Sequence, residues 1–79
     1  MITGVQIREA RALLGWSASA LARAARVRPT TVQRAEATDG EPVITMVQVS
    51  AIQRVLEAAG VEFTNGSEPG VKMRKQGAR

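Results

Sequence analysis

Apolar residues recur at helical spacing near the start of the chain, which predicts a helix over Gly4–Leu14. The apolar stripe along its inward side comprises Ile7, Ala10, Leu13 and Leu14. Thr3 precedes the helix and Gln6 follows three residues later, which is the spacing of a capping box. Gly15 then provides the left-handed residue that commonly ends a helix.

Two shorter helices are predicted next, separated by a very short link. Ser17 is a suitable cap for an alanine-rich helix over Ala18–Ala25, and Pro29 suits the first position of a helix over residues 29–37. The outward side of the later helix carries threonine, glutamine and arginine rather than core-forming residues. Because the link holds only about three residues, the two helices must cross steeply, as they do in a helix-turn-helix.

The longest apolar pattern predicts a fourth helix, capped by Thr45 and closed by Gly60. Beyond Gly60, apolar and polar residues alternate over Val61–Thr64 and over residues 71–74, which predicts a β-hairpin. Because an isolated hairpin is marginally stable, its apolar side chains must pack on the helices or against a second copy. These side chains are Val61, Phe63, Val71 and Met73.

The predicted fold class is therefore mostly α. A four-helix helix-turn-helix domain is expected at residues 1–60, a C-terminal β-hairpin at 61–74 and a flexible basic tail at 75–79. Trp16 and Phe63 are the only aromatic residues, and both are expected in the core. Their scarcity argues against binding of single-stranded nucleic acid, which uses exposed aromatic faces for stacking.

The composition excludes several kinds of active site. The 79 residues include no cysteine and no histidine, so disulfides, thiolate or imidazole metal sites and nucleophile–histidine pairs are excluded. The seven carboxylates are scattered, without the spacing of an acid–base pair. There is no signal peptide and no apolar run of membrane length. We expect a cytoplasmic protein that is not an enzyme and has no metal, cofactor, membrane partner or small-molecule ligand.

Charge is distributed unevenly along the chain, which has a net charge of +4. Residues 1–35 contain six arginines and one glutamate, whereas residues 36–70 contain six carboxylates and one arginine. Residues 71–79 add four basic side chains. This distribution favours a molecule that presents one basic face to a polyanion, although chance clustering on a solvated surface is an equal alternative.

The segment WSASALARAARVRPTTVQRAE, residues 16–36, resembles the helix-turn-helix of the Xre-type, phage-repressor-like regulators. The residues that carry the likeness are Trp16, Ser17, Leu21, Ala22, Val27, Val32 and Glu36. The likeness extends over about residues 5–59, and the hairpin is similar to that of small single-domain bacterial and phage members. It implies a regulator, expected to be a repressor, that binds double-stranded DNA on the bacterial nucleoid. A homodimer is also implied, with the hairpin as the candidate dimerisation element.

The resemblance also implies roles for the exposed residues of the motif, because it places the helix over residues 29–37 in the DNA major groove. The base-reading residues would be Arg28, Pro29, Thr30 and Arg34, and those near the DNA backbone would be Ser17, Arg26, Thr31 and Gln33. Arg34 is the strongest candidate, since a guanidinium can bind guanine O6 and N7 together; the alternative is a surface salt bridge. Arg11 and Glu36 match a pair that bridges two helices in relatives, which implies a structural ion pair.

Two arginines depart from the pattern of the Xre-type regulators. Arg26 stands where the family usually has glycine in the turn, and Arg28 where serine or threonine usually caps the third helix. Each is expected to cost about 1 kcal/mol, through a left-handed backbone or a lost cap. We interpret both as DNA contacts that override stability; the alternatives are drift in a tolerant loop and a turn in which Arg26 stays helical. The alternative function is a protein-interaction module, such as an antitoxin or adaptor.

Overall fold

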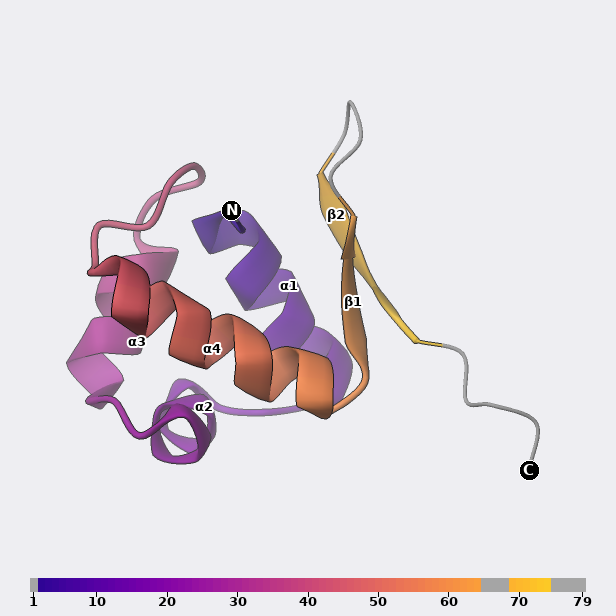
Figure 1. Ribbon diagram of the computed structural model, residues 1–79, viewed down its shortest axis with the longest axis horizontal. Coiled ribbons are helices and arrows are strands. Elements are labelled where there is room, and N and C mark those ends of the chain that lie inside the picture. Colours follow the sequence, from indigo (N-terminus) through magenta and orange to yellow (C-terminus); the bar gives the residue numbers. More distant parts are fainter. Residues whose placement is uncertain (1, 65–68, 75–79) are drawn as a thin grey trace.

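The computed structural model describes residues 2–64 and 69–74 (Figure 1). Within these ranges four helices precede a two-stranded antiparallel sheet. The elements are α1 (Gly4–Leu14), α2 (Ala18–Ala25), α3 (Pro29–Glu36), α4 (Met46–Ala58), β1 (Val61–Thr64) and β2 (Gly70–Met73). This arrangement confirms the predicted fold class, which is a mostly helical domain followed by a C-terminal hairpin.

The bounds of the elements are close to those predicted from the sequence. α1 and α2 have the predicted bounds, α3 ends one residue earlier at Glu36, and β2 both begins and ends one residue earlier, at Gly70 and Met73. The predicted basic tail at residues 75–79 lies outside the described residues. No helix among the residues that the structure describes is long and apolar enough to span a bilayer.

α1 and α4 begin with the same capping arrangement. The Thr3 hydroxyl accepts a hydrogen bond from the Gln6 N–H at 3.1 Å, and the Gln6 side-chain oxygen accepts one from the Thr3 N–H at 2.8 Å. Thr45 and Gln48 make the same two bonds, at 3.1 and 3.0 Å. Both predicted capping boxes are therefore formed, which satisfies donors that a helix start would otherwise leave without partners.

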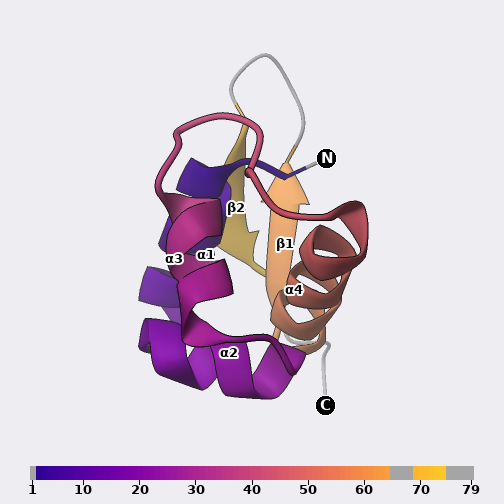
Figure 2. The ribbon, with the colours of Figure 1, turned by 90° about the vertical axis from the view of Figure 1, so that its left-hand side faces the viewer.

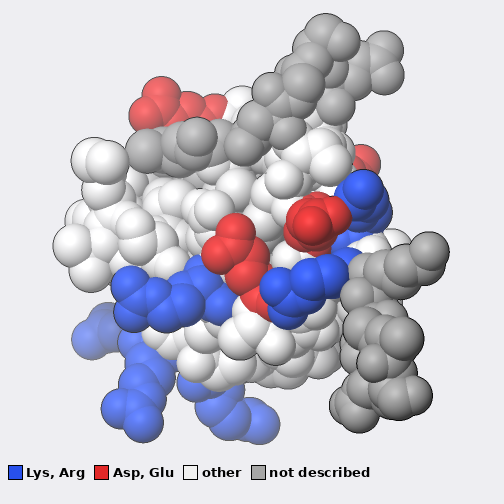
Figure 3. Space-filling model, turned by 45° about the vertical axis from the view of Figure 1, so that its right-hand side comes forward, with Lys and Arg blue, Asp and Glu red and all other residues white. Residues whose placement is uncertain are grey.

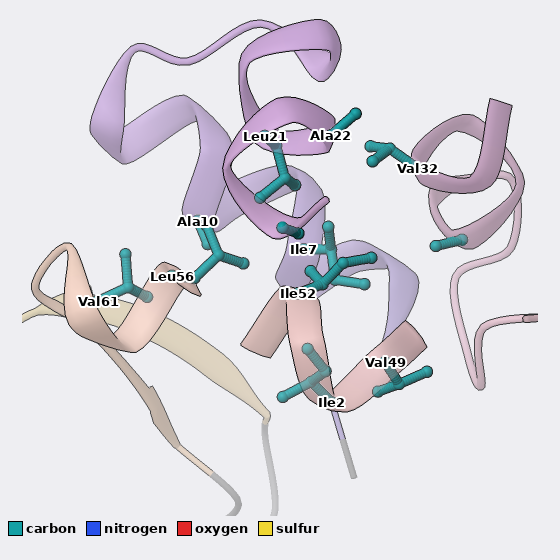
Figure 4. Packing of buried hydrophobic residues seen from close by; sticks show 12 residues of the cluster. Ile2, Ile7, Ala10, Leu21, Ala22, Val32, Val49, Ile52, Leu56 and Val61 are labelled. Atoms are coloured by element: carbon teal, nitrogen blue, oxygen red, sulfur yellow. The ribbon is translucent and has the colours of Figure 1, made fainter. Parts of the chain in front are cut away.

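The core lies between the four helices, and Val61 of β1 also contributes to it (Figure 4). Its buried apolar residues are Ile2, Ile7, Ala10, Leu21, Ala22, Ala25, Val32, Ala35, Val49, Ile52, Leu56 and Val61. Trp16 and Phe63 are partly buried and pack against this cluster. The expectation for Leu13 is wrong, because its residue is 47% exposed. It lies six positions after Ile7, which at helical pitch turns it about 120° away from that residue.

The hairpin packs on α1 and α4, with β2 beside α1 and β1 beside α4 (Figures 1 and 2). Its register pairs Val61 with Met73 and Phe63 with Val71. Val61 is buried, and Phe63 and Val71 are partly buried against the core, whereas Met73 is exposed. Of the two alternatives predicted for the apolar face, the structure shows packing on the helices, with Met73 as the exception.

Gln6 connects the start of α1 to the hairpin. Its side chain is 1% exposed, and its Nε2 donates to the carbonyl oxygens of Thr64 at 3.1 Å and Gly70 at 3.0 Å. The same side chain also closes the α1 capping box through its oxygen. One buried amide therefore satisfies polar groups of two elements that are about 60 residues apart in sequence.

α1 also lies very close to the chain that follows α3. The Gly4 N–H donates to the carbonyl oxygen of Gly40 at 2.8 Å. A Cβ at Gly4 would overlap the carbonyl oxygens of Thr38 and Ala35. Only glycine leaves room for this approach, so the start of α1 sets the position of the end of α3.

Candidate nucleic-acid interface

The link between α2 and α3 turns on a left-handed arginine. Arg26 has φ 61° and ψ 43°, and among the described residues other than glycine only Arg26 has a positive φ. The N–H of Val27 donates to the Ala22 carbonyl at 2.9 Å, a bond that closes helices ending in a left-handed residue. The alternative in which Arg26 stays helical is therefore wrong. The turn keeps an unfavourable conformation that costs about 1 kcal/mol.

The start of α3 has no side-chain cap. Arg28 occupies the capping position in an extended conformation, and its side chain makes no capping hydrogen bond. Its carbonyl accepts from the N–H groups of Thr31 at 2.9 Å and Val32 at 3.3 Å, and Pro29 takes the first helical position. The Arg28, Pro29 and Thr30 side chains are exposed. The arginine side chain is therefore free to extend from the helix start into solvent.

The opposite end of α3 is held by two arginines of α1. Arg11 binds the Glu36 carboxylate through Nε at 2.8 Å and Nη2 at 2.9 Å, and its Nη1 donates to the Trp16 carbonyl at 2.9 Å. Arg8 donates to the Glu36 carbonyl at 2.7 Å and to the Asp39 carboxylate at 2.8 Å. The C-terminal end of α3 is therefore anchored to α1, which leaves its N-terminal end to project.

The Arg11–Glu36 pair is mostly shielded from solvent. Glu36 is 8% exposed. The hydrogen bond to Glu36 raises the pKa of Arg11 above its ordinary value, the attraction of the carboxylate adds to this, and burial opposes it. The guanidinium therefore keeps its positive charge at neutral pH. The structure brings these two residues together as the sequence motif implied.

The structure places the remaining predicted site residues on the surface of the α2–α3 unit. Those that are exposed are Ser17, Arg26, Arg28, Pro29, Thr30, Gln33 and Arg34, and Thr31 is half-buried. Ser17 lies at the far end of α2 from Arg26, separated by a helix of eight residues or about 12 Å. Its hydroxyl caps α2 by accepting from the Ala20 N–H at 3.0 Å. The site therefore divides into a group around the turn and α3, and the separate Ser17.

The arginines of this surface are not neutralised by nearby carboxylates. Asp39 is paired with Arg8 and Glu36 with Arg11, so neither is available to the exposed arginines. In the described ranges no ion pair involves the side chains of Arg23, Arg26, Arg28 or Arg34. In Figure 3 the charged side chains that project from the lower edge, the side on which α2 lies in Figure 1, are Lys or Arg. The surface therefore carries uncompensated positive charge.

An open groove extends the α3 surface towards α4. It has a volume of about 470 Å³ and is lined by Thr31, Arg34, Val43, Ile44, Thr45 and Gln48. Sequence reasoning did not select Val43, although an apolar residue two positions before the Thr45 cap was a signal that could have found it. Sequence reasoning also missed the anchoring role of Arg8, for which the one-dimensional pattern offers no signal.

The arrangement offers donors that can bind anions. Guanidinium and hydroxyl groups are the donors that proteins use on phosphates and base edges. The described residues contain no group of three or more carboxylates that could hold a metal ion. The surface therefore suits recognition of a polyanion.

Two comparisons with known proteins find no relative of this chain. A scan against protein-family models and a search of curated protein sequences both return no match. The likeness to Xre-type regulators therefore depends on the residues of the 16–36 segment.

Proposed function

We propose that this protein is an Xre-type transcriptional regulator that binds double-stranded DNA in a sequence-specific manner and acts as a non-catalytic repressor in the bacterial cytoplasm. The observation that carries the proposal is the asymmetry of α3. Its C-terminal end is bound to α1 by Arg8 and Arg11, whereas its N-terminal end is exposed and rich in arginines without ion pairs. A helix that projects in this way has the shape and charge that fit the major groove.

In this proposal the α3 side chains divide between bases and phosphates. Arg34 binds guanine O6 and N7 through its guanidinium, and Thr30 contacts a base edge or a thymine methyl group. Arg28 and Pro29 lie against the bases at the helix start. The DNA backbone is contacted by Ser17, Arg26, Thr31 and Gln33, whose donors fix the register of the protein on the duplex.

Specific recognition also requires two copies of the chain. A single domain of this size contacts too few base pairs for high specificity, and two-fold symmetric operators solve this with half-sites about one helical turn apart. We therefore propose that the active form is a homodimer. The selected DNA sites should be inverted repeats.

Selection of bound duplexes from a random pool, followed by anisotropy titrations of the best site, tests the proposal. Arg34→Ala should cost about 1–3 kcal/mol of binding free energy and relax selection at one base pair. Lys72→Ala also removes one positive charge, but from the exposed face of the hairpin, and is the matched control. It should leave the selected DNA sequence unchanged.

Salt dependence separates specific DNA binding from the alternative function. The logarithm of the association constant should fall steeply with the logarithm of salt concentration, by roughly one unit for each phosphate contact. A protein without duplex affinity at low salt would contradict the proposal. It would favour the protein-interaction module, an antitoxin or adaptor, instead.

A further inference from the structure

Exposed apolar residues gather at the start of α4. Val43 is 69% exposed, Met46 70% and Val47 79%, and these three lie within five residues of one another in sequence. The other large apolar residues that are exposed in the described chain, Leu13 and Met73, lie on different elements. Single exposed apolar residues are ordinary, whereas a cluster usually marks an interaction surface.

The exposed face of α4 has large side chains at one end and small ones beside them. A recess of about 340 Å³ is lined by Met46, Val47, Ser50, Ala51 and Arg54. The small residues follow the large ones by about one helical turn. We propose that a second copy of this chain docks here, with the two α4 helices antiparallel and each copy's Met46 and Val47 over the other's Ser50 and Ala51. We call this surface the α4 face.

A two-fold axis makes the α4 face complementary to itself. In an isologous interface the same patch serves both copies, so large residues must meet small ones across the axis. An antiparallel pair meets this condition, because it reverses the order of large and small residues. Small residues at the crossing also allow the helix axes to approach to about 8 Å.

Charges at the two ends of the α4 face favour the same orientation. Glu41 precedes the patch and Arg54 ends it; both are exposed, and neither has an ion-pair partner among the residues described. Antiparallel docking brings Glu41 of one copy towards Arg54 of the other. It also sets the two helix dipoles in opposition, which is their favourable arrangement.

The hairpin, which the sequence offered as the dimerisation element, has little apolar surface left. Val61, Phe63 and Val71 pack on the chain's own helices. Its outward face carries the cross-strand pair of Lys72 and Glu62, with Nζ and Oε1 3.4 Å apart. The α4 face is therefore the better surface for a second copy. This inference depends on the proposed function, which requires a dimer, and names where that dimer forms.

Charge insertion tests the α4 face in the absence of DNA. Val47 is the second residue of α4, and Ser19 is the second residue of α2; a glutamate suits both helix starts electrostatically. Sedimentation equilibrium at protein concentrations on the order of tens of micromolar should show dimers for wild type and Ser19→Glu. The dimer dissociation constant of Val47→Glu should be at least about tenfold higher. A monomeric wild type, or Val47→Glu with the wild-type association constant, overturns the inference. Equal far-ultraviolet circular dichroism spectra and a cooperative melting transition in each establish that both variants are folded.

Cross-linking gives an independent measurement, because the chain contains no cysteine. Ser50→Cys places one thiol in the α4 face, and Ala24→Cys places one on the exposed surface of α2. A short bis-maleimide should convert the Ser50→Cys protein to covalent dimer and leave the Ala24→Cys protein monomeric. Equal yields for the two variants overturn the inference.

The two proposals fail in different ways. If wild type selects DNA sites but Val47→Glu is as dimeric as wild type, docking through the α4 face is wrong and the proposed function stands. If no duplex is bound but Val47→Glu abolishes the dimer, the α4 face stands and the proposed function is wrong.

Discussion

Arg11 and Glu36 form a bidentate ion pair that joins α1 to the last turn of α3. The carboxylate is almost fully buried, so its charge depends on the guanidinium for compensation. The pair lies about two helical turns from the exposed end of α3, yet it determines which end of that helix is free. The Arg11–Glu36 ion pair thus fixes how α3 exposes its candidate DNA-reading residues.

Removal of one partner of this pair should destabilise the fold more than removal of both. Arg11→Ala leaves a buried carboxylate without compensation and should lower the free energy of unfolding by about 2–3 kcal/mol. The double variant Arg11→Met/Glu36→Leu should lose about 1 kcal/mol or less, because no unpaired charge stays buried. Urea unfolding of the three proteins checks this. Additive effects, with the double variant the least stable, would contradict it.

Gln6 should contribute more to the free energy of unfolding than Gln48, which closes the corresponding capping box of α4. Gln6→Ala removes a capping bond and two bonds to the hairpin carbonyls, and should cost about 2–3 kcal/mol. Gln48→Ala removes only the equivalent capping bond and should cost about 1 kcal/mol. Thermal and urea unfolding measure the difference. Amide exchange at β1 and β2 should accelerate in Gln6→Ala alone; equal protection in both variants would show that Gln6 does not hold the hairpin.

An alanine at Gly4 should be poorly tolerated. Its Cβ would overlap the main-chain oxygens of Ala35 in α3 and Thr38 just after it, so the backbone must shift at a cost of about 1–3 kcal/mol. Gly40→Ala is the matched control, since nothing lies within 4 Å of the Cβ position there. The free energy of unfolding should change by less than about 0.5 kcal/mol in the control. If Gly4→Ala is equally neutral, the close approach of α1 to the end of α3 is wrong.

Replacing either of the two unusual arginines, Arg26 or Arg28, should raise stability and weaken DNA binding. Arg26→Gly relieves the left-handed strain and Arg28→Ser supplies the missing cap, so each should raise the free energy of unfolding by about 1 kcal/mol. If both side chains contact DNA, each substitution should weaken operator binding and reduce its salt dependence. Melting curves and anisotropy titrations measure the two effects. Greater stability with unchanged affinity would show that these arginines reflect drift in a tolerant loop.

Much of the fold could be predicted because its signals are local. Capping pairs such as Thr45 and Gln48 form within one helical turn, and turn residues such as Gly15 act on their own backbone. The exposed side of α3 was also predictable, since helical spacing alone separates Val32 from Arg34. The left-handed Arg26 was expected from its place in the motif, and the structure has it.

The sequence by itself determined the elements, their ends and the polar side of α3, because these depend on residues within a few positions of one another. The tertiary structure alone decided which neighbour each surface would meet. It exposed Leu13, bound Gln6 to the hairpin and left the α4 face uncovered. These outcomes depend on the directions in which whole helices pack, and helix packing joins residues whose spacing along the chain carries no periodic signal.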